Sequence, residues 1–243
     1  MYILGVRMDE IKRTTALEKI KGFLHGNDSK MVFTPNPEML VDAQRDTYFK
    51  EVLNKGDLNI CDGKGIELVS RRKLERIPGI DFMLDVCALA EKEQKSVYLL
   101  GGRREDVIER CKKILLQQFP NLKIVGAVCG PKIEKSFAVD KEENEKVIDD
   151  IIDAAPDIVF VAFGHGKQEK WIYGFLPELP SVKVAMGVGG SFDFIAGNAK
   201  RAPEFLRRAG FEWLWRLIRE PRRIKRIWKA TVVFLFYFFI HKP

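Results

Sequence analysis

The stretch Ser96-Val-Tyr-Leu-Leu-Gly101-Gly102 is an unbroken apolar run that ends in two glycines. Helical patterns flank it at residues 81–94 and 105–119. A short apolar run between two such patterns is typical of a parallel strand that is buried on both faces of a sheet. The stretch therefore decides the fold class, because a buried parallel strand needs further strands beside it and helices that cross between them.

The same alternation continues in both directions along the chain. On the C-terminal side, residues 122–128, 157–163 and 182–186 are further apolar runs, and helical patterns at 141–154 and 168–176 separate them. On the N-terminal side, a short hairpin turns at Gly5, and predicted strands follow at 31–34 and 58–61. The sequence predicts an α/β fold with a Rossmann-like parallel sheet that helices cover on both faces.

Charge divides the chain into two parts. The 243 residues carry a net charge of +7, but residues 200–243 hold 12 Lys and Arg against 3 Asp and Glu, so residues 1–199 sum to −2. The composition also changes near Gly197, beyond which the chain is aromatic, basic and helical in pattern. We expect an α/β catalytic core over residues 1–197 and a helical appendage over residues 198–243 that binds an anionic partner.

Neither metal nor disulfide chemistry is indicated. The four cysteines lie 18 to 26 residues apart without a C-x-x-C pair, and the three histidines are scattered. The spacing fits neither a zinc site nor a disulfide framework, and no D-x-D motif is present. We therefore expect reduced thiols, no metal and no cofactor.

The carboxyl ends of parallel strands, where α/β proteins bind ligands, carry three glycine loops here. The glycine loops are Gly101-Gly102, residues 164–168, and residues 187–193 with Gly187, Gly189, Gly190 and Ser191. One such turn alone is more often structural, but three at one sheet edge favour a nucleotide or phosphate site, because backbone amides can approach the phosphate. None has dinucleotide-fingerprint spacing, so a nucleotide-dependent oxidoreductase is a competing but weaker interpretation.

Two other strand ends carry candidate reactive groups. Asp62 precedes Gly63, where a carboxylate can act as a general base or simply cap a turn. Thr34 lies at the end of a predicted strand, in the motif Thr34-Pro-Asn36. Its hydroxyl either hydrogen-bonds a bound sugar or is only a structural part of the turn.

The later loops carry candidate ligands. Gln168 is a candidate because its amide both donates and accepts hydrogen bonds. The neighbouring Glu169 is better explained by the favourable helix dipole at a helix start. Asp193 either binds a nucleobase or ribose or caps a helix, and the sequence leaves both open.

The appendage combines clustered charge with an apolar run. The basic stretch at 222–226 is followed by Trp228 and by nine consecutive apolar residues at 232–240. The apolar run from Ala230 to Ile240 is 11 residues long, against roughly 20 for a spanning helix. This pattern favours a helix that lies in the interface of an anionic membrane. A solvated basic face, a core helix and nucleic-acid binding are the alternatives, and nucleic acid leaves the apolar run unexplained.

Six motifs occur in order between residues 3 and 226. They are Thr34-Pro-Asn36, Cys61-Asp62-Gly63-x-Gly65, Arg76-Ile-Pro-Gly79-x-Asp81, Gly164-x-x-Lys167-Gln168-Glu169-Lys-Trp171, Gly187-Val-Gly-Gly-Ser-Phe-Asp193 and Lys200-Arg201-Ala-Pro203. Together they resemble the signature of the WecG/TagA/CpsF glycosyltransferases, which is glycosyltransferase family 26. The similarity is specific because of the ordered set, since no single motif would suffice.

The resemblance implies a fold of the GT-E type and an inverting sugar transfer. TagA-like members transfer N-acetylmannosamine from UDP onto undecaprenyl-diphospho-N-acetylglucosamine in wall teichoic acid synthesis, and WecG-like members transfer N-acetylmannosaminuronic acid. It therefore implies a UDP-sugar donor, a polyprenyl-diphosphate-linked acceptor, and a peripheral place at the cytoplasmic face of a bacterial membrane through residues 216–243. Nucleic acid is not expected as a partner. The sequence leaves the oligomeric state open: a core without its appendage would expose apolar surface, through which a homo-oligomer could form.

The resemblance also implies roles for particular residues. The important cleft residues of TagA-like enzymes fall on Thr34 and Asp62, and the arginines that the family's appendage supplies match Arg216, Arg223 and Arg226. Substrate contacts are expected from loop residues: Asn36, Gly63, Gly101, Gly102, Gln168, Gly187, Gly189, Gly190, Ser191, Asp193 and Arg201.

The sequence departs from the family pattern in three places. Gly166 and Cys61 stand where proline is expected, and the terminal apolar run is longer than in TagA-like members. None removes a candidate catalytic residue, but the donor sugar stays open between N-acetylmannosamine, its uronic acid and a hexose. A non-enzymatic membrane adaptor that binds a nucleotide is the alternative of another class.

Overall fold

The centre of the molecule is a parallel sheet. The computed structural model describes residues 1–71, 73–102, 104–134 and 139–240, without the side chains of Arg208 and Arg216. Within these residues the sheet has six strands in the order β4-β3-β8-β7-β5-β6, all parallel. The strands are β3 (Lys30–Phe33), β4 (Leu58–Asn59), β5 (Ser96–Gly101), β6 (Lys123–Val128), β7 (Ile158–Ala162) and β8 (Val184–Gly187). The predicted α/β fold with a parallel sheet is confirmed.

Strand β5 shows why the apolar runs lie at the centre of the sheet. Every residue of β5 after Ser96 is buried, and the strand pairs with β7 on one side and β6 on the other. Val97 and Leu99 belong to the apolar cluster on one face, whereas Tyr98 and Leu100 belong to the cluster on the opposite face. An unbroken apolar run satisfies both faces at once because side chains alternate along a strand.

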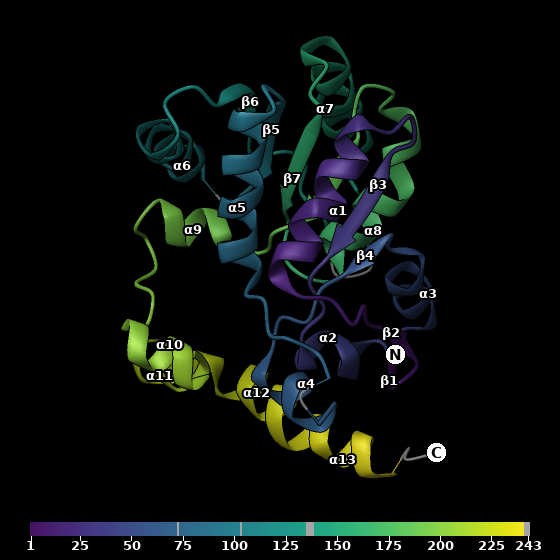
Figure 1. The fold of residues 1–243 in the computed structure, drawn as a ribbon, viewed down its shortest axis with the longest axis vertical. Helices are drawn as coiled ribbons and strands as arrows, with labels where there is room; N and C mark the ends of the chain where they lie inside the picture. The colour runs from purple at the N-terminus through teal and green to yellow at the C-terminus, as the bar shows by residue number, and fades with distance from the viewer. Residues whose placement is uncertain (72, 103, 135–138, 241–243) are drawn as a thin grey trace.

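Helices cover both faces of the sheet (Figure 1). One apolar cluster contains residues of α1 (Arg13–His25), α5 (Gly79–Lys92), α6 (Glu105–Gln118) and α9 (Ser191–Ile195). The other contains residues of α2 (Pro37–Asp42), α3 (Thr47–Lys55), α4 (Lys64–Val69), α7 (Lys141–Ala154) and α8 (Lys167–Phe175). The predicted N-terminal hairpin, β1 (Tyr2–Ile3) and β2 (Val6–Arg7), packs on this second face.

The sheet has a switch point between the neighbouring strands β3 and β8. After β3 the chain continues into α2 on one face, and after β8 it continues into α9 on the opposite face. The connections therefore diverge at the carboxyl ends of β3 and β8, which is where open α/β sheets bind ligands. The residues that follow these two strands are Thr34 and Val188.

The C-terminal segment is helical, as predicted. It comprises α10 (Glu204–Ala209), α11 (Glu212–Arg219), the 3-10 turn η2 (Pro221–Arg223), α12 (Ile224–Trp228), the π-helical η3 (Lys229–Val233) and α13 (Phe234–Ile240). This appendage lies on the same side of the molecule as α2 and α4, which follow the carboxyl ends of β3 and β4 (Figure 1). The division of the chain at residue 197 stays a prediction.

The terminal apolar run serves two faces of one helix. Phe234 is completely buried on the core, and Val233, Tyr237 and Phe238 pack partly against the same cluster. Phe236 and Phe239 on the other side are each 61% exposed. The nine consecutive residues are all apolar because this helical segment has two apolar faces. One face packs on the core, and the other is exposed. Among the described residues, no helix is both long and apolar enough to cross a membrane.

Gly101 offers a test of the close strand packing at the sheet edge. Its φ is +109°, and a Cβ placed on it would lie 2.7 Å from the carbonyl carbon of Ala162. We expect Gly101→Ala to lower the free energy of unfolding by about 2–4 kcal/mol, because it combines backbone strain with a clash against backbone. Urea unfolding of the purified variant measures this loss.

Gly22→Ala is the matched control for that experiment. Gly22 lies within α1, and a Cβ there would meet no atom of the described part of the chain within 4 Å. The free energy of unfolding of the Gly22→Ala variant should rise by about 0.5–1 kcal/mol, because alanine has a higher helix propensity than glycine. Equal stability of the two variants would contradict the packing explanation.

Candidate active site

Two polar side chains converge at the ends of β3 and β4. Thr34 follows β3 and is buried, and Asp62 follows β4, with its amide donating to the Pro35 carbonyl at 3.0 Å. A Cβ placed on Gly79 would lie 3.1 Å from Thr34 Oγ1 and 3.4 Å from Asp62 Oδ2. The hydroxyl and the carboxylate therefore face one point at the start of α5. A helix N-terminus favours negative charge, so the surroundings suit an ionised aspartate.

Glycines make this convergence possible. A Cβ on Gly63 would lie 2.5 Å from Pro37 Cδ, and one on Gly65 would lie 3.2 Å from Pro37 Cγ. The loop after β4 can therefore lie directly on the loop after β3. Asn36 connects the same loop to α2, since its Oδ1 accepts a hydrogen bond from the Met39 amide at 3.1 Å as the N-cap. Its expected substrate contact stays a prediction.

Gln168 shapes the glycine loop that follows β8. Its Oε1 accepts a hydrogen bond from the Gly189 amide at 2.9 Å, and its Nε2 donates to Glu169 Oε1 at 2.8 Å. A Cβ on Gly187 would lie 2.8 Å from the same Nε2. Gln168 is buried and bonded at both ends, so its side chain holds the loop in place. Its predicted contact with substrate stays a prediction.

Glu169 completes this buried network. Its Oε2 accepts a hydrogen bond from the Gly166 amide at 2.6 Å, which caps the start of α8. Burial raises the pKa of the Glu169 carboxyl above its usual range, although hydrogen bonds from Gln168 and Gly166 act in the opposite direction. The residue is at the helix start, as expected, and its contacts are within the protein.

The backbone beyond this network is open. Among the described residues, nothing lies within 4 Å of a Cβ placed on Gly189 or Gly190, and a Cβ on Gly102 would meet a ring carbon of Phe192 at 3.9 Å. Ser191 is buried and donates its hydroxyl to the Val188 carbonyl at 2.6 Å. The open glycines could accept a phosphate against the backbone. Asp193 is partly buried on α9, and its contact with a nucleotide stays a prediction.

Arg201 joins the start of the appendage to the start of α5. Its Nη1 and Nη2 donate to the Asp81 carboxylate at 2.5 and 3.2 Å. Burial lowers the pKa of the Arg201 guanidinium, but the hydrogen bond to Asp81 and the negative charges of Asp81 and Glu212 together outweigh that effect, so the net shift is upward. The group is therefore a permanent cation, and the Asp62 charge contributes to the same shift.

The structure gives the appendage arginines different surroundings. Arg226 donates from Nε to both oxygens of Glu38 at 3.1 Å and from Nη2 to Oε2 at 2.9 Å. Arg223 donates from Nε to Glu220 at 2.6 Å within the appendage. Arg216 is in α11, and its side chain is outside the described part of the structure. The roles predicted for these arginines toward substrate stay predictions.

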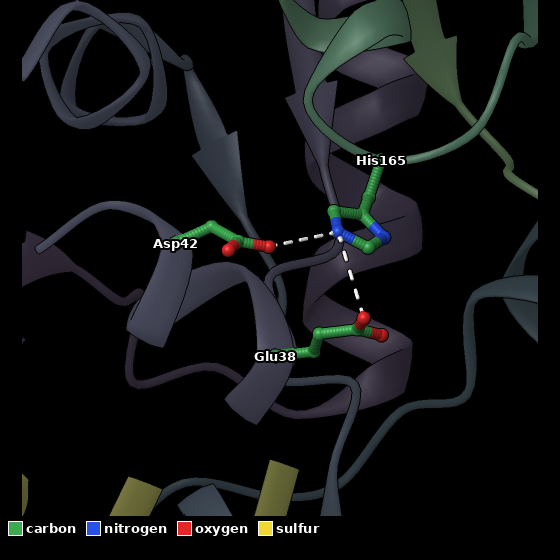
Figure 2. A group of neighbouring side chains, drawn as sticks. All are labelled: Glu38, Asp42 and His165. Atoms are coloured by element: carbon green, nitrogen blue, oxygen red, sulfur yellow. Dashed lines mark hydrogen bonds and ion pairs between the residues drawn. The ribbon is translucent and has the colours of Figure 1, made fainter. Parts of the chain in front are cut away.

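A cluster of three residues was missed by the sequence argument: Glu38, Asp42 and His165 (Figure 2). His165 Nε2 lies 3.1 Å from Asp42 Oδ2 and 4.0 Å from Glu38 Oε1. The available signal was the four-residue spacing of the two acids, which puts them on one face of a helix. The cluster has the residue types of a cation site, but Arg226 and Lys229 already pair with its carboxylates. Its chemistry is therefore that of an ion-pair network.

Cys61 is not a competing nucleophile beside Asp62. Burial, followed by the neighbouring Asp62 charge, raises the pKa of the Cys61 thiol to about 12. The thiolate is the reactive form of cysteine, and it is scarce at neutral pH when the pKa is this high. The Cys61 thiol therefore does not compete with the Asp62 carboxylate, whose role as a base stays a prediction.

Comparison with known proteins gives one consistent result. The model of the glycosyl transferase WecG/TagA/CpsF family matches residues 1–243. An N-acetylglucosaminyldiphosphoundecaprenol N-acetyl-beta-D-mannosaminyltransferase of Bacillus subtilis (strain 168) is 34% identical over 211 residues, which cover 85% of this chain and 78% of the relative. A protein with the same name from Staphylococcus aureus (strain MW2) is 33% identical over 245 residues, covering 96% of this chain and 90% of the relative.

Proposed function

The chain belongs to the WecG/TagA/CpsF family of glycosyl transferases, and we propose that it transfers N-acetylmannosamine from a UDP-sugar to N-acetylglucosaminyl-diphosphoundecaprenol. The observation that carries the proposal is that relatives named for this transfer match nearly the whole chain. The positions of Thr34 and Asp62, which face one point, agree with it. The reaction serves cell-wall or surface polysaccharide synthesis.

The chemistry is a single displacement with inversion. A hydroxyl of the acceptor N-acetylglucosamine attacks the anomeric carbon of the donor, and its proton passes to Asp62. The bond between that carbon and the diphosphate oxygen breaks, and UDP leaves with the electron pair. Thr34 hydrogen-bonds a sugar near this carboxylate. This role is supported by the fact that both groups approach the point where a Cβ on Gly79 would lie.

The donor diphosphate binds against the open glycine backbone, and protein cations stabilise its growing charge. No described residue comes within 4 Å of a Cβ placed on Gly189 or Gly190, and Gly187, Ser191, Gln168 and Asp193 build or flank the same loop. Arg216, Arg223 and Arg226 supply the positive charge, because guanidinium groups pair well with phosphate and a preorganised cation lowers the barrier for a departing anion.

The membrane carries the acceptor, and the appendage brings the enzyme to it. The outer face of α12, η3 and α13 exposes large apolar side chains: Ile224, Trp228, Val232, Leu235, Phe236, Phe239 and Ile240. Basic residues at 222–226 lie beside them. This combination suits a helix that lies in the interface of an anionic bilayer. We place the protein peripherally at the cytoplasmic face, where nucleotide sugars are available.

The function is tested by UDP release from the purified full-length protein. The assay combines detergent-solubilised undecaprenyl-diphospho-N-acetylglucosamine with a panel of UDP-sugars. We expect acceptor-dependent release with UDP-N-acetylmannosamine. Release with only UDP-N-acetylmannosaminuronic acid or a UDP-hexose would overturn the donor assignment and keep the transfer. The absence of acceptor-dependent release with every donor would overturn the proposal.

Asp62→Asn tests the general base. The amide keeps the shape of the side chain but cannot take the acceptor proton, so kcat should fall by about 10²–10⁴-fold. The affinity for UDP, measured by calorimetry, should stay within about threefold, since the base acts on the acceptor. Asp106→Asn in the exposed ion pairs of α6 is the control and should keep wild-type kcat. Wild-type turnover by Asp62→Asn would exclude this role.

Vesicle co-sedimentation tests the outer face of the appendage. Binding should be stronger to vesicles with phosphatidylglycerol than to pure phosphatidylcholine, and it should weaken with salt because the charge contribution is screened. The double variant Phe236→Glu and Phe239→Glu should lose most of the binding. Ile152→Glu is the control, since α7 lies at the opposite end of the molecule from α13 (Figure 1). Equal binding by all three proteins would refute this membrane contact.

A further inference from the structure

Helix α2 presents two acids to the appendage. The helix starts directly after the Thr34 loop, with Asn36 as its N-cap and Pro37 in its first turn, so its position follows that of β3. Glu38 and Asp42 are four residues apart and therefore lie on one face of the helix. Glu38 is buried and Asp42 is partly buried, so both carboxylates require partners at neutral pH.

The appendage supplies those partners with matching spacing. Arg226 and Lys229 are three residues apart, and each pairs with one acid of α2. Arg226 holds Glu38 through Nε and Nη2, whereas the Lys229 ammonium contacts Asp42 Oδ1. η3 packs on α2 at the same place. A shift of the appendage by one helical turn would leave both acids without these partners.

We propose that Glu38 and Asp42 are positioning residues that fix the register of the appendage on the core. We call the four residues Glu38, Asp42, Arg226 and Lys229 the clamp. The proposal rests on the proposed function, because the clamp sets where the guanidinium of Arg226 lies relative to the Thr34 loop. Glu38 engages Nε and Nη2 of that guanidinium, which leaves the N–H groups of Nη1 outside the pair.

Apolar packing and the clamp make different energetic contributions to the position of the appendage on the core. Phe234 is completely buried, and a Cβ on Gly65 would lie 3.6 Å from its ring. Apolar burial is non-directional, so it holds the appendage on the core without choosing one register. Charge pairs at partly buried positions add little net affinity but penalise every arrangement that leaves a charge unpaired. The clamp therefore selects the register that apolar packing allows.

His165 connects a third segment to the clamp. It follows β7 in the loop before α8, and its Nε2 lies 3.1 Å from Asp42 Oδ2 (Figure 2). Burial raises the pKa of the Asp42 carboxyl, but the hydrogen bonds from His165 and Lys229 and the charges of these two partners together outweigh this effect, so the net shift is downward. Asp42 is thus ionised at neutral pH and joins α2, the loop before α8 and the appendage.

A charge-swap cycle tests the clamp. Asp42→Lys and Lys229→Asp each put like charges together, and the double variant restores an opposite pair. Neither residue belongs to the proposed catalytic groups. With UDP-N-acetylmannosamine and lipid acceptor, we expect each single variant to lose about tenfold or more in kcat with a KM for the donor within about twofold, and the double variant to recover to within about threefold of wild type.

Hydrogen exchange gives a readout that needs no turnover. Amides of residues 224–240 should exchange about tenfold faster or more in each single variant and recover in the double variant, while core amides of β5 stay protected. Glu38→Gln should show the same loosening, and Glu142→Gln, in an exposed pair with Lys146 on α7, should not.

The outcomes separate the two proposals. If the wild-type protein shows no turnover, but exchange is faster in the single variants and recovers in the double variant, the proposed function fails and the clamp is supported. Single variants with wild-type exchange and kcat, or a double variant no better than the single ones, would overturn the clamp. Loss of protection in β5 as well would also overturn it, because the acids would then act on overall folding.

Discussion

The parallel pairing of β3 with β8 is the contact on which the site depends. Lys30, Met31 and Val32 pair with Val184, Ala185 and Met186, although about 150 residues separate the two strands in the chain. This pairing places the Thr34 loop next to the glycine loop that begins at Gly187. Such long-range contacts close large loops at an entropic cost, which burial of apolar side chains on both faces of the sheet offsets.

The glycines of this edge fall into two physical groups. Gly63, Gly79 and Gly187 lie where a Cβ would crowd Pro37, Thr34 and Gln168, so they allow protein segments to approach one another. Gly189 and Gly190 have open space before them, so they leave room for a ligand. The sequence predicted that the glycine loop at 187–193 binds a phosphate, but within this loop Gly187 is crowded by Gln168, whereas Gly189 and Gly190 are open among the described residues. The first group instead brings the polar side chains together.

Local patterns predicted most of the fold because they report local burial. The apolar runs that became β5, β7 and β8 were recognisable, and so were the strand ends that carry Thr34 and Asp62. The strand predicted at 58–61 is shorter, since regular pairing ends at Asn59 and the Asp62 amide then bonds to the Pro35 carbonyl. The pairing of Glu38 with Arg226 could not be predicted, because 188 residues separate the partners and other acids carry the same charge.

The contacts of the appendage explain why the core of the chain is negatively charged and the appendage is basic. The core has a net negative charge, and three of its acids pair with basic residues of the appendage. The pairs are Asp81 with Arg201, Glu38 with Arg226 and Asp42 with Lys229. These pairs neutralise charge on the inner side of the appendage, where the three carboxylates are buried or partly buried. The outer side keeps exposed aromatic and aliphatic groups that no described part of the core covers. One face of this helical segment thus forms ion pairs with the core, and the opposite face exposes an apolar surface. The same register determines both faces, because a rotation that broke the inner pairs would also turn the outer face away.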